Sequence, residues 1–152
     1  MVIMEEVKIC SPFLRMNSHI HRTSKPRPMK TLSMIARILL GLMMLIFGLN
    51  KFFHFIPMEM PSEGPAFDYF MALSSVKLMT IVGGLEVICG ILLLVKKYVA
   101  LAAVILAAIL FNAVLFHLML DPGGSAGGIL ALVFNIIVLY AERERLSGLF
   151  EA

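Results

Sequence analysis

Long apolar runs separated by short polar stretches dominate the pattern of this chain. An α-helix needs about 20 apolar residues to cross the hydrocarbon core of a bilayer, and it satisfies its own backbone hydrogen bonds there. The pattern therefore predicts an all-α fold, a polytopic membrane protein built as a bundle of four transmembrane helices. The predicted spans cover residues 33–55, 76–95, 98–120 and 124–141.

The beginning of the chain has a different character, because it is polar and basic and shows no apolar period. Prolines in the segment SKPRP, Ser24 to Pro28, disfavour a helix there. We interpret residues 1–30 as a disordered cytoplasmic tail and residues 31–152 as the membrane domain. A second interpretation stays open, in which translation starts at Met29, because MKTLSMIARILL is a typical opening of a membrane helix.

Composition and charge agree with a membrane protein. Hydrophobic residues make up 60% of the chain and charged residues 15%, which is too apolar for a soluble domain of this size. The net charge of +3 comes mainly from the amino-terminal tail and indicates no nucleic-acid partner. Two further basic sites are Lys96 with Lys97 and Arg143 with Arg145, whereas the other two connections carry no Lys or Arg. The positive-inside rule then places both termini in the cytoplasm.

One face of the first span combines charge with small residues. Five residues of this span follow one another at intervals of four, three, four and three positions, which puts them on one side of a helix. Two of the five are glycines. Small residues allow close approach of helices in a bilayer, so we expect this face to turn toward the rest of the bundle. Its members are Arg37, Gly41, Met44, Gly48 and Lys51.

A single acid, Glu86, lies at the centre of the second span. An ionisable group at this depth is costly, so it normally faces protein or a cavity and indicates a functional site. Side chains lean toward the start of their helix, so Glu86 leans outward and Lys51 inward, which makes Lys51 the expected partner and Arg37 the second choice. A structural role stays open, in which a neutral Glu86 only fixes helix packing.

Further polar residues are expected near Glu86 in the outer half of the bundle. A rise of about 1.5 Å per residue places Glu86, Asn112 and Asn135 in one layer, roughly 12 to 15 Å below the outer boundary. Such asparagines commonly form hydrogen bonds between helices, and they can also orient a ligand. The candidate ligand-binding residues are Asn50, Lys51, Glu86, Asn112, His117 and Asn135.

A metal site is a weaker alternative. The segment HFIPMEM offers His54, Met58 and Met60, and thioether sulfurs are ligands that suit copper(I). Methionine is more often a filler of apolar gaps, so we assign no metal. The chain has no GxGxxG, no CxxCH and no cysteine cluster, so no flavin, haem or iron–sulfur cofactor is indicated. Redox chemistry would have to come from a partner or from a diffusible quinone.

Three segments resemble one known family. ARILLGLMMLIFGLNKFFHF, Ala36 to Phe55, resembles the opening helix of the DoxX family, with an arginine near its start and a glycine and a lysine near its end. GGLEVICGILLLV, Gly83 to Val95, resembles that family's second helix, in which a glutamate precedes a glycine and a leucine run. LFHLMLDPGG, Leu115 to Gly124, is similar to the small bacterial branch with four helices. The resemblance covers roughly residues 33–150.

The resemblance implies a multi-pass protein of the bacterial inner membrane, and Arg37, Lys51 and Glu86 match the family's motif positions. Members have been linked to membrane oxidoreductase assemblies, to thiosulfate oxidation with quinone as acceptor, and to resistance to oxidants. We therefore expect an accessory subunit of a redox or oxidative-stress system that binds a quinone-type ligand and is not a catalyst alone. Its expected partners are the bilayer, a membrane oxidoreductase and a second copy of the chain. Two alternatives stay open, a small transporter or channel and an assembly protein without ligand.

Overall fold

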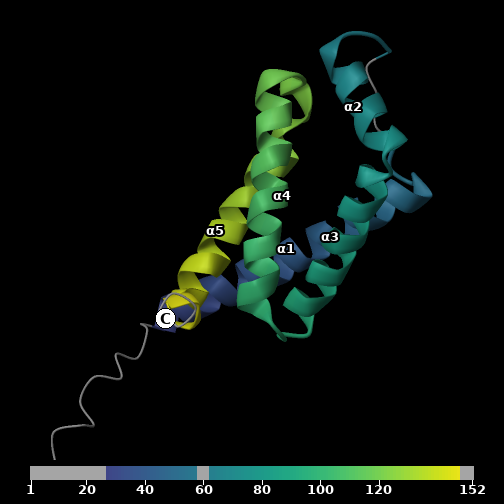
Figure 1. The fold of residues 1–152 in the computed structure, drawn as a ribbon. Helices are drawn as coiled ribbons and strands as arrows, with labels where there is room; N and C mark the ends of the chain where they lie inside the picture. Colours follow the sequence, from purple (N-terminus) through teal and green to yellow (C-terminus); the bar gives the residue numbers. More distant parts are fainter. Residues whose placement is uncertain (1–26, 58–61, 148–152) are drawn as a thin grey trace, which may run out of the picture.

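The computed structural model describes residues 27–57 and 62–147, most of which are helical, with no strand among them. The predicted all-α fold is therefore confirmed for the described residues. Residues 1–26, and with them most of the predicted tail, lie outside this part of the chain. The helices, shown in Figure 1, are α1 (Arg27–Phe53), α2 (Pro65–Ser75), α3 (Leu78–Leu94), α4 (Val99–Met119), the 3-10 helix η2 (Pro122–Gly124) and α5 (Ser125–Ser147).

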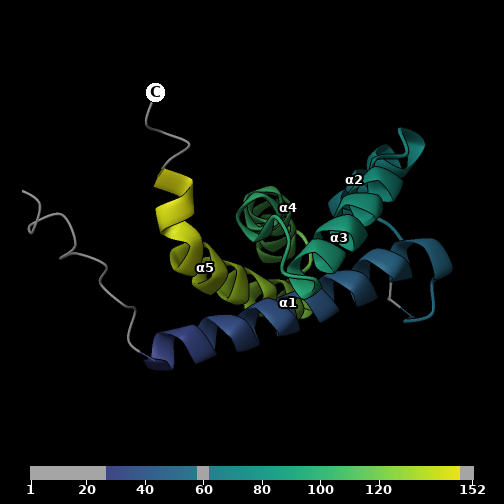
Figure 2. The ribbon, with the colours of Figure 1, turned by 90° about the horizontal axis from the view of Figure 1, so that it is seen from below.

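Four of the helices form a bundle in which each has two main neighbours. Helix α1 packs against α3 and α5, and α4 packs against the same two helices. Short connections make α3, α4 and α5 consecutive antiparallel neighbours. Seen from below in Figure 2, α1 runs along one side of the bundle, and α4 stands between α5 and α3. The four helices therefore form a closed ring of contacts in the order α1, α3, α4 and α5.

The bundle has the dimensions of a membrane protein. Helices α1, within Met29–Phe53, α4 and α5 are each long and apolar enough to cross a bilayer. Helix α3 reaches the required length only together with α2, as a bent pair, so the chain has three candidate spans, or four if this pair is one span. Large apolar side chains such as Ile88, Leu101 and Phe111 are exposed on the outside of the bundle, where lipid would solvate them.

The segment between the first two predicted spans was interpreted as a loop, and this prediction is wrong, because the segment contains helix α2. Pro65 occupies the start of this helix, where a missing backbone N–H costs little, and Ala66 is buried. Lys77 then adopts a left-handed conformation, with φ of 59°, and α2 and α3 meet at an angle of 79°. The prolines of this segment begin and flank the helix rather than exclude it.

Helix α1 also begins earlier than predicted, at Arg27 instead of residue 33. Pro28 lies in its first turn, where a missing backbone N–H costs little. The segment SKPRP therefore contains the beginning of the first helix, and the predicted boundary between tail and membrane domain lies inside α1.

Candidate functional site

The glycine-rich face of α1 meets α3, as its spacing predicts. A Cβ atom built on Gly48 would lie 2.9 Å from the carbonyl oxygen of Gly83, and one built on Gly90 would lie 2.9 Å from that of Gly41. These distances are too short for any side chain, so the two backbones approach as closely as only glycine allows. Two pairs of glycines thus fix the distance and register of α1 against α3.

An ion pair lies at one end of this glycine contact. The Lys51 Nζ atom, in the last turn of α1, lies 2.5 Å from the Glu86 Oε2 atom in the middle of α3. The Lys51 side chain is 20% exposed and the Glu86 side chain 7%. Glu86 is eight residues from either end of α3, or about 12 Å of helix, so its carboxylate lies midway along this apolar helix. The direction in which side chains lean along a helix predicts Lys51 as the partner of Glu86, and the two side chains form this ion pair in the structure.

Gly83 makes room for the ion pair. It lies one turn before Glu86 on the same face of α3, and a Cβ atom there would be 3.1 Å from the Lys51 Cβ and 3.1 Å from the Phe52 ring. The absence of a side chain lets the Lys51 stem pass over α3 toward Glu86. Gly83 and Phe52 were not among the predicted site residues, although the spacing of three between Gly83 and Glu86 indicates a shared face.

Arg37 lies at the opposite end of the same interface. Its Nη1 atom donates hydrogen bonds to the carbonyl oxygens of Leu93 and Leu94, the last residues of α3. The Leu93 carbonyl oxygen also accepts a hydrogen bond of 3.3 Å from the Lys96 backbone N–H, and the cation adds a further donor and interacts favourably with the helix dipole. Arg37 precedes Lys51 by 14 residues, or about 21 Å of helix, so the second-choice pairing of Arg37 with Glu86 is wrong.

Asn50 closes the turn that follows α1. Its Oδ1 atom accepts a hydrogen bond of 2.7 Å from the Ile56 backbone N–H, and its Nδ2 atom donates one of 3.3 Å to the Ile56 carbonyl oxygen. The side chain is buried, with 4% exposure. Both ends of the amide are therefore bound to backbone, which makes Asn50 a support for the neighbouring Lys51 rather than a group directed at a ligand.

The two remaining asparagines lie apart. Asn112 is exposed and its Oδ1 atom accepts a hydrogen bond of 3.0 Å from the Tyr69 hydroxyl. Asn135 is fully buried, and its Nδ2 atom donates to the Ala103 carbonyl oxygen at 3.2 Å. Ala103 precedes Asn112 by nine residues, or about 14 Å along α4. The predicted single layer of Glu86, Asn112 and Asn135 is therefore wrong.

The physical reason is the tilt of the helices. The count of 1.5 Å per residue assumes upright helices with level ends, whereas α5 runs obliquely behind α4 in Figure 1. Asn135 consequently faces the first turns of α4 instead of its middle. The Oδ1 atom of Asn135 is buried without a hydrogen-bond partner among the described residues.

His117 lies near the end of α4, and the residues of the alternative metal site lie in the segment after α1. The His117 Nδ1 atom lies 3.3 Å from the Asp121 carbonyl oxygen and 3.5 Å from the Asp121 Oδ2 atom, where α4 ends. His54 is exposed, and Met58 and Met60 lie outside the described residues. Across residues 27–57 and 62–147, no group of three His, Cys, Asp or Glu side chains is placed to hold a metal ion.

An aromatic cluster attaches α2 to α4. The Tyr69 and Phe116 rings stack with centroids 5.2 Å apart, and Phe70 meets the edge of Phe116 at 5.1 Å. The hydrogen bond from Tyr69 to Asn112 adds a polar contact beside these rings. The sequence pattern did not predict that Tyr69 and Phe70 hold a helix against the bundle.

Comparison with known proteins gives one result that agrees with this geometry. The family model DoxX matches residues 32–118, which run from the first turns of α1 to the end of α4 and include Arg37, Lys51 and Glu86. No curated protein and no solved structure matches the chain.

Proposed function

Because the chain belongs to the DoxX family and is a multi-pass membrane protein, we propose that it is an accessory subunit that binds a quinone-type ligand beside Lys51 and Glu86 for a membrane redox system. One observation carries this proposal, the ion pair with its Nζ–Oε2 distance of 2.5 Å inside an apolar bundle. Ionisable groups at this depth are costly, and proteins commonly retain them for function.

The chemistry of the pair suits a quinone. A lysine ammonium group has three N–H donors, and in the structure one of them is directed at Glu86. The other donors can bind a quinone carbonyl oxygen, while the carboxylate can accept a hydrogen bond or a proton from the reduced quinol. The Lys51 side chain, at 20% exposure, gives access to the pair from one side. Phe52 beside it is 42% exposed and offers an apolar surface to the ring or the tail.

In this proposal the electrons pass between a partner oxidoreductase and the quinone, and the chain supplies the binding site. The proposed location is the bacterial inner membrane with both termini in the cytoplasm. Basic residues support this orientation, because Lys96 and Lys97 in the α3–α4 turn and Arg143 and Arg145 near the end of α5 gather at one end of the bundle.

A second candidate function is assembly without a ligand. The glycine contacts between α1 and α3 favour it, because the Lys51–Glu86 pair then completes an interface that is already closely packed. The free energy that holds α1 against α3 would then come from packing, and the ion pair would fix the register of the two helices. The transporter alternative has less support, since Asn112 and Asn135 do not share a layer that a solute path would need.

The test is the quinone content of the purified protein. Wild type is isolated in mild detergent, its lipids are extracted, and bound quinone per protein is measured by mass spectrometry. Glu86→Gln is compared with Glu144→Gln, a control that makes the same change at an exposed position near the end of α5. We expect wild type and the control to retain quinone and Glu86→Gln to lose it. Absence of quinone from wild type, or equal retention by a folded Glu86→Gln protein, would overturn the proposal in favour of assembly.

A further inference from the structure

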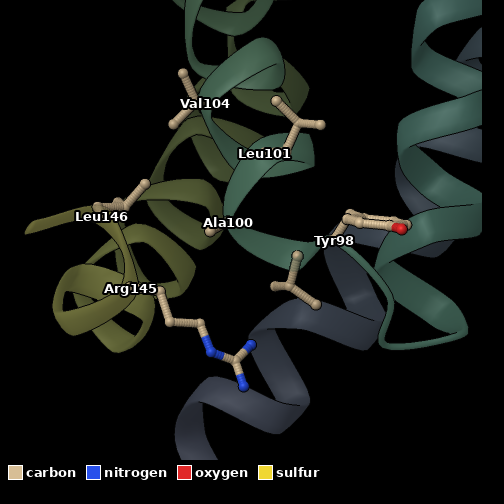
Figure 3. Close-up of a pocket in the computed structure, with 7 residues that line it drawn as sticks. Tyr98, Ala100, Leu101, Val104, Arg145 and Leu146 are labelled. Carbon is tan, nitrogen blue, oxygen red and sulfur yellow. The ribbon is translucent and has the colours of Figure 1, made fainter. Parts of the chain in front are cut away.

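A cavity of about 500 Å³ lies between the start of α4 and the end of α5, at the basic end of the bundle. The first two turns of α4 form one wall, and Arg145 and Leu146 of α5 form the other (Figure 3). It lies at the opposite end of α3 from the turn between α2 and α3, and Lys51 and Glu86 do not line it. A ligand in this cavity would be distinct from one at the ion pair.

The upper part of the cavity is apolar. Leu101 and Val104 lie one turn apart on the same face of α4, and they are 55% and 47% exposed. Leu146 of α5 also lines the cavity. Since these side chains border the lipid-facing side of the bundle, they form a groove of the kind that accommodates an acyl chain.

The lower part of the cavity is basic. Arg145 extends from α5 toward α1 in Figure 3, and its side chain is 71% exposed. One of its five N–H donors is used in a hydrogen bond of 2.9 Å from Nη1 to the Glu142 Oε2 atom, which leaves others for a ligand. Lys96 and Lys97 are exposed in the turn that precedes α4. Arg145 thus lines the cavity itself, and the two lysines add positive charge in the adjacent turn.

We propose that this cavity binds an anionic phospholipid, with the phosphate at Arg145 and an acyl chain against Leu101 and Val104. Basic pockets between membrane helices on the cytoplasmic side attract anionic headgroups. Tyr98, at 73% exposure beside the cavity, has the amphipathic ring that typically lies at headgroup level. The charge favours an anionic headgroup over a zwitterionic one, because a choline group would meet the same cations with repulsion.

The test uses the full-length protein in mild detergent and counts bound lipid by native mass spectrometry, with phosphatidylglycerol and phosphatidylcholine as probes. We expect wild type to bind phosphatidylglycerol in preference. Arg145→Gln should weaken its binding roughly fivefold, the effect typical of one basic residue near an anionic membrane surface. Arg143→Gln is the matched control, because Arg143 lies over the Tyr140 ring, at 4.3 Å, and does not line the cavity.

A second pair of variants tests the groove independently of charge. Leu101→Trp should fill the apolar wall and displace the lipid, whereas Leu118→Trp, at an exposed position near the other end of α4, should leave binding intact. Equal binding of the two lipids by wild type, or equal effects of Arg145→Gln and Arg143→Gln, would overturn the proposal. Neither outcome bears on the quinone proposal, because that site lies on α1 and α3.

Discussion

Lys51 and Glu86 are 35 positions apart in the sequence, and their Nζ and Oε2 atoms lie 2.5 Å apart across the interface of α1 and α3. At the other end of this interface, Arg37 holds the last carbonyl groups of α3. The glycine contacts lie between these two cations. Helix α1 therefore holds α3 through Arg37 at the end of α3, through Lys51 at its middle and through the close glycine contacts, and this unit is the part of the fold that places Glu86.

The first prediction concerns the energy of the ion pair. Lys51→Met should lower the free energy of unfolding by roughly 3 kcal/mol, because it leaves a buried carboxylate without its partner. Glu86→Gln should cost less, since Lys51 can extend toward the interface. The double variant should be less destabilised than the sum of the two. Detergent-titrated unfolding measures all three, and strictly additive effects would mean that the two side chains do not interact.

The second prediction concerns the glycine contacts. Gly48→Ala and Gly90→Ala would each place a methyl group 2.9 Å from a carbonyl oxygen of the opposite helix, so each should lower the free energy of unfolding by about 1 to 3 kcal/mol. Gly84→Ala is the control, because nothing lies within 4 Å of its added Cβ atom. That variant should be neutral or gain up to about 1 kcal/mol from helix propensity. Equal effects of all three would show a looser interface than the one described.

The third prediction concerns Arg37. Arg37→Met should expose the last carbonyl groups of α3 and cost about 1 to 2 kcal/mol, the range of a charged group bound to a helix end. Hydrogen exchange should become faster in the last turn of α3 and stay unchanged around Glu86. If Arg37→Met abolished folding while Lys51→Met left stability unchanged, Lys51 would not be the partner that Glu86 requires.

The fourth prediction concerns the attachment of α2. Tyr69→Phe keeps the ring that stacks on Phe116 and removes the hydrogen bond to Asn112, so it should cost about 1 kcal/mol or less. Phe116→Ala removes the contacts to both aromatic rings of α2 and should release this helix more strongly. Hydrogen exchange in α2 reports both effects. An unchanged α2 in Phe116→Ala would show that the aromatic cluster does not hold it.

Some of this arrangement follows from the sequence because it depends on local geometry. Helical spacing alone puts Gly41, Gly48 and Lys51 on one face, and the direction of the side chains selects Lys51 as the partner of Glu86. The apolar runs predict the spans because a bilayer demands helices of a given length. These inferences need no knowledge of how the helices cross.

Other features depend on how helices tilt, and the sequence pattern does not contain that information. Asn135 reaches Ala103 because α5 runs obliquely to α4, which no count along single helices foresees. Helix α2 was missed because prolines and acids in the segment outweighed its short apolar pattern. The cavity at Arg145 depends on the packing of two helix ends and has no sequence signature.

The most direct test of the central claim, that the Lys51–Glu86 pair binds a ligand and does not serve packing alone, is the affinity of the purified protein for a short-chain ubiquinone. We predict saturable binding by wild type and by Glu144→Gln, and a loss of roughly tenfold or more in folded Glu86→Gln, as expected for losing a hydrogen bond to a charged group. Binding that is absent from wild type, or unchanged in Glu86→Gln, would contradict the claim and leave the pair as a structural element between α1 and α3.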